Sequence, residues 1–136
     1  MSSMKLNNFQ SESLNIITIS SDTVLTRHHC GSIIFCDASS AININLPPPE
    51  HGLHLTFIVK DHTAHTTIYS QTNNFDSSGS SLIYIINSNI STDSLQNKFI
   101  IKSDAAKKGD KIELICDGEY WYASCTLHSS TAVASS

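Results

Sequence analysis

The residues best suited to metal or proton chemistry in this chain are its histidines and cysteines. Six of the seven histidines fall into three short groups: His28-His29, which precedes Cys30, His51 with His54, and His62 with His65. A zinc site needs three or four nitrogen or sulfur ligands that converge in a tetrahedron. On a β-strand, side chains three residues apart point to opposite faces, so neither HxxH pair forms a two-ligand unit unless a turn intervenes. We therefore interpret these residues as solvated turn histidines. A cupin-like, His-liganded metalloenzyme is the minor alternative, because both pairs flank turns.

Other catalytic patterns are weaker. The chain has no Gly-x-Ser-x-Gly elbow, its five glycines are scattered, and no pair stands out among its twelve carboxylates. Asp110 and Asp117 stand at the ends of predicted strands, where turn chemistry explains an aspartate. The sequence therefore predicts a protein that is not an enzyme, with no catalytic residues, no cofactor and no metal.

The four cysteines, at positions 30, 36, 116 and 125, show no CxxC spacing. A disulfide-dense secreted scaffold has more cysteines in a shorter chain. We expect four reduced thiols that behave as small hydrophobic residues. Whether Cys30 and Cys36 pair stays open, since a short loop could bring them together.

Charge and hydropathy exclude several partners. The formal net charge is −4, whereas nucleic-acid binding depends on clustered Lys and Arg. The apolar runs are too short to cross a bilayer, so no membrane insertion is expected. Residues 1–15 lack the apolar central run of a secretory signal.

The elements that must position these residues are short strands. Apolar and polar residues alternate with a period of two at 42–46, 53–60 and 112–116, and turn residues lie between such runs. Nine strands are predicted: 15–19, 32–36, 41–46, 53–60, 65–70, 82–87, 97–102 and the two strands of a hairpin around Asp117-Gly118. This pattern predicts an all-β fold, a single antiparallel, jelly-roll-like β-sandwich of about eight or nine short strands.

The predicted domain spans residues 15–128. A flexible N-terminal arm, residues 1–14, precedes it, with Met4, Leu6 and Phe9 as candidate docking residues. A small polar tail, residues 129–136, is expected to be disordered. The predicted core comprises Leu46, Leu55, Phe57, Val59, Ile112, Leu114 and Trp121.

The C-terminal hairpin concentrates the aromatic residues. If its loop is the four residues Asp117 to Tyr120, Cys116 faces Trp121, and Trp121 points into the core. Tyr122 then points outward. Tyr120 and Tyr122 are the candidate contact surface.

The order of these segments resembles a known module. Its pieces are Thr23-Val24-Leu25, the runs 31–39, 42–47, 52–61 and 66–68, and the terminal run Gly109 to Gly118 followed by Trp121-Tyr122. Together they resemble the small β-module of bacteriophage tail-fibre and capsid-fibre proteins and of structural proteins of large DNA viruses. The resemblance covers roughly residues 20–125. The chain differs in an extra segment between Leu82 and Asn97, in more Cys and His, and in lacking a fibre shaft.

The resemblance implies a non-catalytic β-sandwich found at or near fibre ends, often as a trimer. We therefore expect a virion structural protein, made in the host cytoplasm, that forms a homotrimer and docks on other capsid or tail proteins. It would serve as a capsid decoration, a fibre head or a tail-fibre module. The alternative is a carbohydrate- or receptor-binding module that recognises a host surface glycan.

Overall fold

Short strands dominate the described part of the chain, which comprises residues 15–70, 81–87 and 94–135 of the computed structural model. The strands are β1 (Ile16–Ile19), β2 (Thr23–Val24), β3 (Ile33–Asp37), β4 (Ile42–Asn45), β5 (His51–Asp61), β6 (Thr66–Tyr69), β7 (Ile83–Ile86), β8 (Lys98–Ile101), β9 (Lys111–Asp117), β10 (Trp121–Thr126) and β11 (Val133–Ala134). Two single turns of 3-10 helix, η1 (Arg27–His29) and η2 (Ser130–Ala132), complete the described elements.

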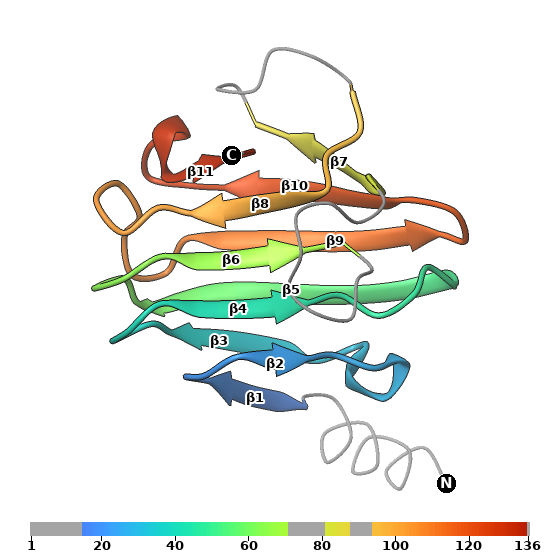
Figure 1. The fold of residues 1–136 in the computed structure, drawn as a ribbon, viewed down its shortest axis with the longest axis horizontal. Coiled ribbons are helices and arrows are strands. Elements are labelled where there is room, and N and C mark those ends of the chain that lie inside the picture. Colours follow the sequence, from blue (N-terminus) through green and yellow to red (C-terminus); the bar gives the residue numbers. More distant parts are fainter. Residues whose placement is uncertain (1–14, 71–80, 88–93, 136) are drawn as a thin grey trace, which may run out of the picture.

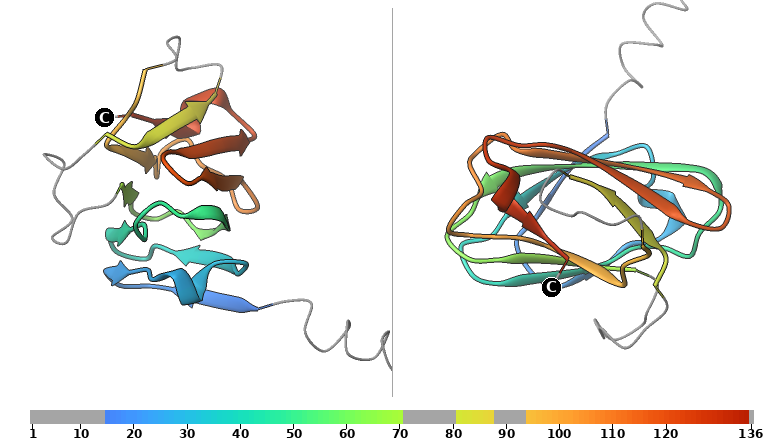
Figure 2. Two further views of the ribbon diagram at one scale, coloured as in Figure 1. Left: turned by 90° about the vertical axis from the view of Figure 1, so that its right-hand side faces the viewer. Right: turned by 90° about the horizontal axis from the view of Figure 1, so that it is seen from above.

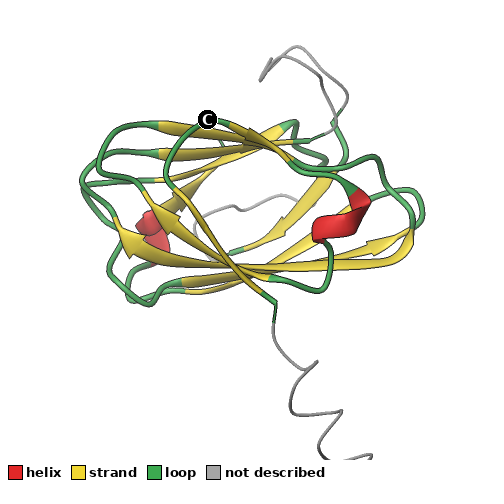
Figure 3. Ribbon diagram, turned by 90° about the horizontal axis from the view of Figure 1, so that it is seen from below, coloured by secondary structure: helices red, strands yellow, loops and turns green. Residues whose placement is uncertain are grey.

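The strands form two sheets that face each other. Sheet A has the order β1-β3-β5-β9-β10-β7, and sheet B has the order β11-β8-β6-β4-β2. Seen from above and below, the two sheets appear as two layers, with the short helices near the ends of the molecule (Figure 2, Figure 3). The predicted all-β sandwich is confirmed, with eleven strands instead of eight or nine.

The first six strands wind from one sheet to the other, which corrects the antiparallel, jelly-roll-like prediction. β1, β3 and β5 are parallel neighbours in sheet A, and β2, β4 and β6 are parallel neighbours in sheet B. Each consecutive strand therefore crosses to the opposite layer, as in the turns of a coil (Figure 1). The alternation of apolar side chains reports which face of a strand is buried but not which strand lies beside it.

The later strands pair mainly in the antiparallel sense. β9 pairs with both β5 and β10, and β8 pairs with both β6 and β11. β7 is the exception, since it runs parallel to β10. The two sheets are therefore mixed.

The core lies between the sheets. All seven residues predicted for it are at most 2 % exposed: Leu46, Leu55, Phe57, Val59, Ile112, Leu114 and Trp121. Leu55, Phe57 and Val59 alternate along β5, and Ile112 and Leu114 alternate along β9, which is the reason the period of two identified them. Leu46 follows the last residue of β4.

The predicted hairpin has the expected register. Trp121 pairs with Cys116, and Gly118 adopts a φ of 104° in the turn. The Asp117 N–H donates to the Tyr120 carbonyl oxygen at 3.2 Å. On the inward face of the hairpin, Cys125 is only half-buried, and the other side chains are buried: Ile112, Leu114, Cys116, Trp121 and Ala123.

The C-terminal prediction is wrong. Residues 129–135 are not a disordered tail: they include η2 and β11, and β11 pairs with Ile100 and Ile101 of β8. Ala132 and Val133 are fully buried. A segment this short and this rich in Ser and Ala carries no visible strand pattern, and its burial depends on the space left beside β8. The predicted arm, with Met4, Leu6 and Phe9, lies outside the described residues.

Candidate contact surface

The outer face of sheet A carries an unusual share of apolar side chains. Three cross-strand rows make up this face: His54-Ile115-Tyr122-Tyr84, Ile16-Ile33-Thr56-Glu113-Ser124-Ile86 and Thr18-Phe35-Ile58-Lys111-Thr126. Five large apolar side chains are markedly exposed in the described residues, and four of them lie here: Ile16 (55 %), Ile86 (64 %), Ile115 (60 %) and Tyr122 (38 %). The fifth, Val24, lies on the outer face of sheet B. Ile86, Ile115 and Tyr122 lie on the neighbouring strands β7, β9 and β10, whereas Ile16 lies on β1 at the opposite edge of the sheet. Clustered exposed apolar side chains mark interaction surfaces, whereas scattered ones need no explanation.

The two predicted contact tyrosines belong to a cluster of three. Tyr122 stacks on Tyr84, with ring centroids 5.5 Å apart and an interplanar angle of 18°. Tyr120 meets Tyr84 edge to face, with centroids 5.6 Å apart and an angle of 81°. Tyr122 points outward as predicted, and Tyr120 is half-buried. Tyr84 was not predicted, since it comes from β7 and reaches the hairpin only through the parallel pairing of β7 with β10.

Asp117 anchors this cluster to the hairpin turn. Its Oδ1 accepts hydrogen bonds from the backbone N–H groups of Glu119 and Tyr120, both at 2.9 Å. Its Oδ2 accepts a hydrogen bond from the Tyr122 hydroxyl at 2.8 Å. The predicted turn role of Asp117 is confirmed. These hydrogen bonds lower the pKa of the Asp117 carboxyl, and the bond from the Tyr120 N–H has the largest effect.

We expect Tyr122 to ionise above its ordinary pKa of 10.0, because the hydrogen bond to Asp117 favours the neutral phenol. The stabilisation from this bond is complete below the pKa of the unfolded phenol, and it is lost as the pH rises through the raised value. The stabilisation that Asp117 contributes to the fold depends on pH in the opposite direction. It is lost as the pH falls through the lowered pKa of the carboxyl. Absorbance titration of phenolate formation, with Tyr122→Phe to assign the signal, measures the first effect. Asp117→Asn should return the Tyr122 pKa toward its ordinary value, and an unchanged titration would exclude the bond in solution.

A groove opens at the β1 side of the same face. Its volume is about 510 Å³, and its lining includes Ile16, Thr18, Phe35 and Ile58 of sheet A. Lys60 and Lys108 also line it. The groove therefore combines an apolar floor with two cations.

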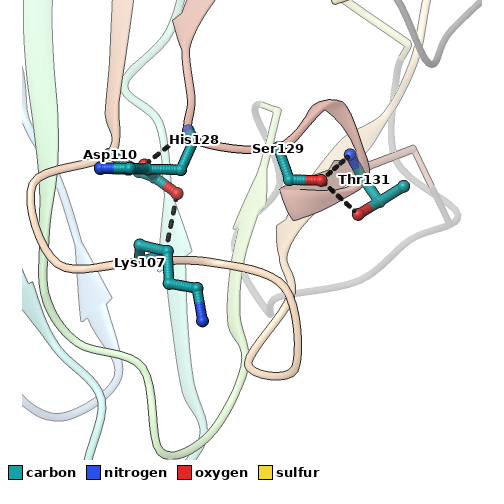
Figure 4. Close-up of polar contacts among 5 residues, drawn as sticks. All are labelled: Lys107, Asp110, His128, Ser129 and Thr131. Atoms are coloured by element: carbon teal, nitrogen blue, oxygen red, sulfur yellow. Dashed lines mark hydrogen bonds and ion pairs between the residues drawn. The ribbon is translucent and has the colours of Figure 1, made fainter.

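A buried aspartate and a histidine form the most compact polar cluster outside the hairpin (Figure 4). Asp110, whose side chain is fully buried, accepts hydrogen bonds from the Lys107 N–H at 2.9 Å and from the His128 N–H at 3.0 Å. The His128 Nδ1 lies 2.5 Å from Asp110 Oδ1. An Asp–His pair suggests a hydrolytic triad, but the Ser129 hydroxyl engages the Thr131 hydroxyl, 2.8 Å away. Because Asp110 binds two backbone N–H groups, we interpret it as a structural link between the loop before β9 and the end of β10.

The histidine groups do not converge into a site. Residues 15–70, 81–87 and 94–135 contain no group of three or more His, Cys, Asp or Glu residues placed to hold a metal ion. His62 and His65 both bind the backbone of Ser103: the Nδ1 of His62 lies 3.1 Å from the carbonyl oxygen, and the Nδ1 of His65 accepts from the N–H at 2.9 Å. His29 Nδ1 accepts the Thr26 N–H at 2.9 Å. These three histidines form hydrogen bonds with the backbone of turns and loops, whereas we expected solvated turn histidines.

All four cysteines are free, and Cys30 and Cys36 are not paired. Burial raises the pKa of the Cys36 thiol to about 12 and that of Cys125 to about 11. Burial is also the first cause of the raised pKa values of Cys30 and Cys116.

We expect all four thiols to react slowly in the folded protein, since the thiolate is the reactive form. Cys36 should react only when the chain unfolds, because it is 1 % exposed. Alkylation followed by peptide mass mapping measures the order of reaction. Unfolding without a reducing agent should then release four titratable thiols, and a count of two would reveal a disulfide.

No protein-family model, curated protein or solved structure matches this chain. No helix within the described residues is long and apolar enough to cross a membrane. The relation to viral β-modules therefore stays a prediction based on the ordered motifs. The candidate site is the outer face of sheet A, with the tyrosine cluster at one corner and the groove at the opposite one.

Proposed function

We propose that this protein is a non-enzymatic structural subunit of a virus particle, which self-associates and docks on other capsid or tail proteins. The observation that carries the proposal is the concentration of exposed apolar side chains on the outer face of sheet A. A face of this kind is stabilised when another protein surface covers it. The virion setting is supported by the motif resemblance of roughly residues 20–125.

The sheet edges support self-association. β1 and β2 are the edge strands of the two sheets at one end of the molecule, and both are short (Figure 1). Neither contains a lysine or a proline, the residues that commonly guard a monomeric edge. Symmetric assembly is one way to cover such edges, and we propose a homotrimer.

Light scattering tests the assembly directly. The purified chain should have about three times its monomer mass of 14.9 kDa. A monomer at micromolar concentration would exclude the proposed trimer. It would also exclude a role of the sheet A face in self-association.

The attachment part of the proposal has its own test. We propose that residues 1–14, with Met4, Leu6 and Phe9, attach the subunit to the particle. Deleting residues 1–14 should preserve the unfolding transition of the domain and abolish incorporation into particles. The triple variant Met4→Ser, Leu6→Ser, Phe9→Ser should have the same effect, whereas Ser2→Ala with Ser3→Ala should not. Normal incorporation of the truncated chain would show that attachment occurs elsewhere.

The tyrosine cluster favours a second candidate function, recognition of a host surface glycan. Sugar rings pack against aromatic faces, and Asp117 lies next to Tyr122 as a hydrogen-bond acceptor. Glycan-array binding that disappears in Tyr122→Ala but survives in Ile86→Ala would support this function. Absence of glycan binding by the assembled protein would exclude glycan recognition, and the structural role would remain the single proposed function.

A further inference from the structure

Two opposite corners of the sheet A face carry opposite charges. The groove corner combines Ile16, Phe35 and Ile58 with Lys60 and Lys108. The pairing of β3 with β5 shifts here, so that Cys36 pairs with Val59 and Asp37 with Asp61. Lys60 is thus the extra residue of a β-bulge, an irregularity that re-aims a side chain. The bulge accounts for the position of Lys60 beside the apolar lining residues of the groove.

The hairpin corner consists of Ile115, Asp117, Glu119 and Tyr122. Ile115 and Tyr122 are exposed neighbours across β9 and β10, and Asp117 and Glu119 are exposed in the adjoining turn. Since His51 pairs with Asp117 and Ile58 with Lys111, the two corners lie at opposite ends of the strands. The turn between β9 and β10 and the loop before β9 appear at opposite sides of Figure 1. The hairpin corner is therefore apolar and acidic, and the groove corner is apolar and basic.

The cations of the groove are available to a partner. Neither Lys60 nor Lys108 forms an ion pair with a residue in the described part of the chain. Asp61 lies within electrostatic reach of Lys108. Asp61 Oδ1 accepts hydrogen bonds from the Thr63 N–H at 2.8 Å and the Thr63 hydroxyl at 2.7 Å, which hold the carboxylate in the turn but leave it charged. None of the residues that line the groove is acidic, so the two lysines dominate its charge.

We propose that the hairpin corner of one copy of this chain seats in the groove of a second copy, with Glu119 facing Lys108 and Tyr122 covering Ile16 and Phe35. The inference rests on the proposed self-association and names its contact. Charge complementarity favours this occupant. Copies with a net charge of −4 repel one another overall, so an attractive contact requires acidic and basic patches that meet locally. Burial of the two apolar surfaces supplies the driving force, and the charges set the orientation.

A charge swap tests the contact. In sedimentation experiments, Lys108→Glu and Glu119→Lys should each weaken self-association by about tenfold, which corresponds to about 1.4 kcal/mol. The double variant K108E/E119K should restore the wild-type affinity, because the attraction is re-formed with reversed signs. Lys107→Glu and Asp104→Lys are the matched controls: they make the same charge changes on exposed residues in the loop before β9. Both controls should associate as the wild type does.

A matched pair of variants also tests the apolar part of the proposed contact. Ile16→Gln should weaken association, whereas Ile16→Leu, which keeps an apolar side chain at the same 55 % exposed position, should not. Unfolding transitions would establish that each variant is folded.

The possible failures are distinguishable. A wild-type chain that stays monomeric overturns the proposed self-association and this contact together. If the wild-type chain assembles, but the double variant loses as much affinity as the two single variants together, the contact alone is overturned. Weakening by Lys108→Glu without weakening by Glu119→Lys also overturns it, since the groove would then receive another acidic segment.

Discussion

Replacing Trp121 with alanine should lower the free energy of unfolding by about 3–5 kcal/mol. The indole is fully buried between the sheets, and its strand pairs with both β9 and β7. Alanine would leave a cavity that the surrounding strands fill only in part, because their backbones are fixed by cross-strand hydrogen bonds. Reversible denaturant unfolding measures the change.

Trp121→Phe is the informative control. The Trp121 Nε1 is buried and has no hydrogen-bond partner within the described part of the chain. Phenylalanine removes this unsatisfied donor while filling most of the volume, so its cost should be well below that of alanine, under about 1.5 kcal/mol. A cost below about 1 kcal/mol for Trp121→Ala itself would place the indole on a surface or in a ligand site.

Ending the chain after Ser129 should also destabilise the domain, by about 3 kcal/mol or more. This truncation removes η2 and β11, including the fully buried Ala132 and Val133. Burial of a valine side chain contributes about 1.5–3 kcal/mol. The truncation also removes the hydrogen bond from the Lys102 N–H to the Ala132 carbonyl oxygen, 2.8 Å long, and exposes Ile101 of β8.

Two variants separate this effect from a general effect of shortening. Ending the chain after Ala134 keeps β11 and should leave the unfolding free energy within about 0.5 kcal/mol of wild type. Val133→Ser should reproduce a large part of the loss, since it places a hydroxyl where the side chain is fully buried. A chain truncated after Ser129 that unfolds as the wild type does would show that residues 130–136 add nothing to stability, as expected of the disordered tail predicted for residues 129–136.

Local patterns in the sequence were sufficient to predict nine of the eleven strands in the described part of the chain, and the buried faces of the longer ones. Leu55, Phe57 and Val59 alternate with polar or less buried neighbours, and a pleated strand converts this period directly into an inward and an outward face. The hairpin was equally predictable, because Asp117-Gly118 specifies the turn and the turn specifies that Trp121 faces Cys116. Tyr122 followed as an outward residue from the same register. In each case the residues that decide the structure are close together in the chain.

The choice of neighbouring strand depended on the tertiary structure. β1 pairs with β3 and β3 with β5 after the chain has crossed to sheet B and back, and the turn residues alone do not tell a crossover from a reversal. β11 is buried only because β8 offers a free edge beside the core. Tyr84 joins Tyr122 through a parallel pairing between segments 38 positions apart. The groove likewise brings together β1, β3, β5 and the loop before β9. The sequence therefore determined the buried side chains of the regularly alternating strands and the turn of the hairpin, since these depend on local periodicity. Only the packing of distant strands decided which exposed side chains meet to form a surface.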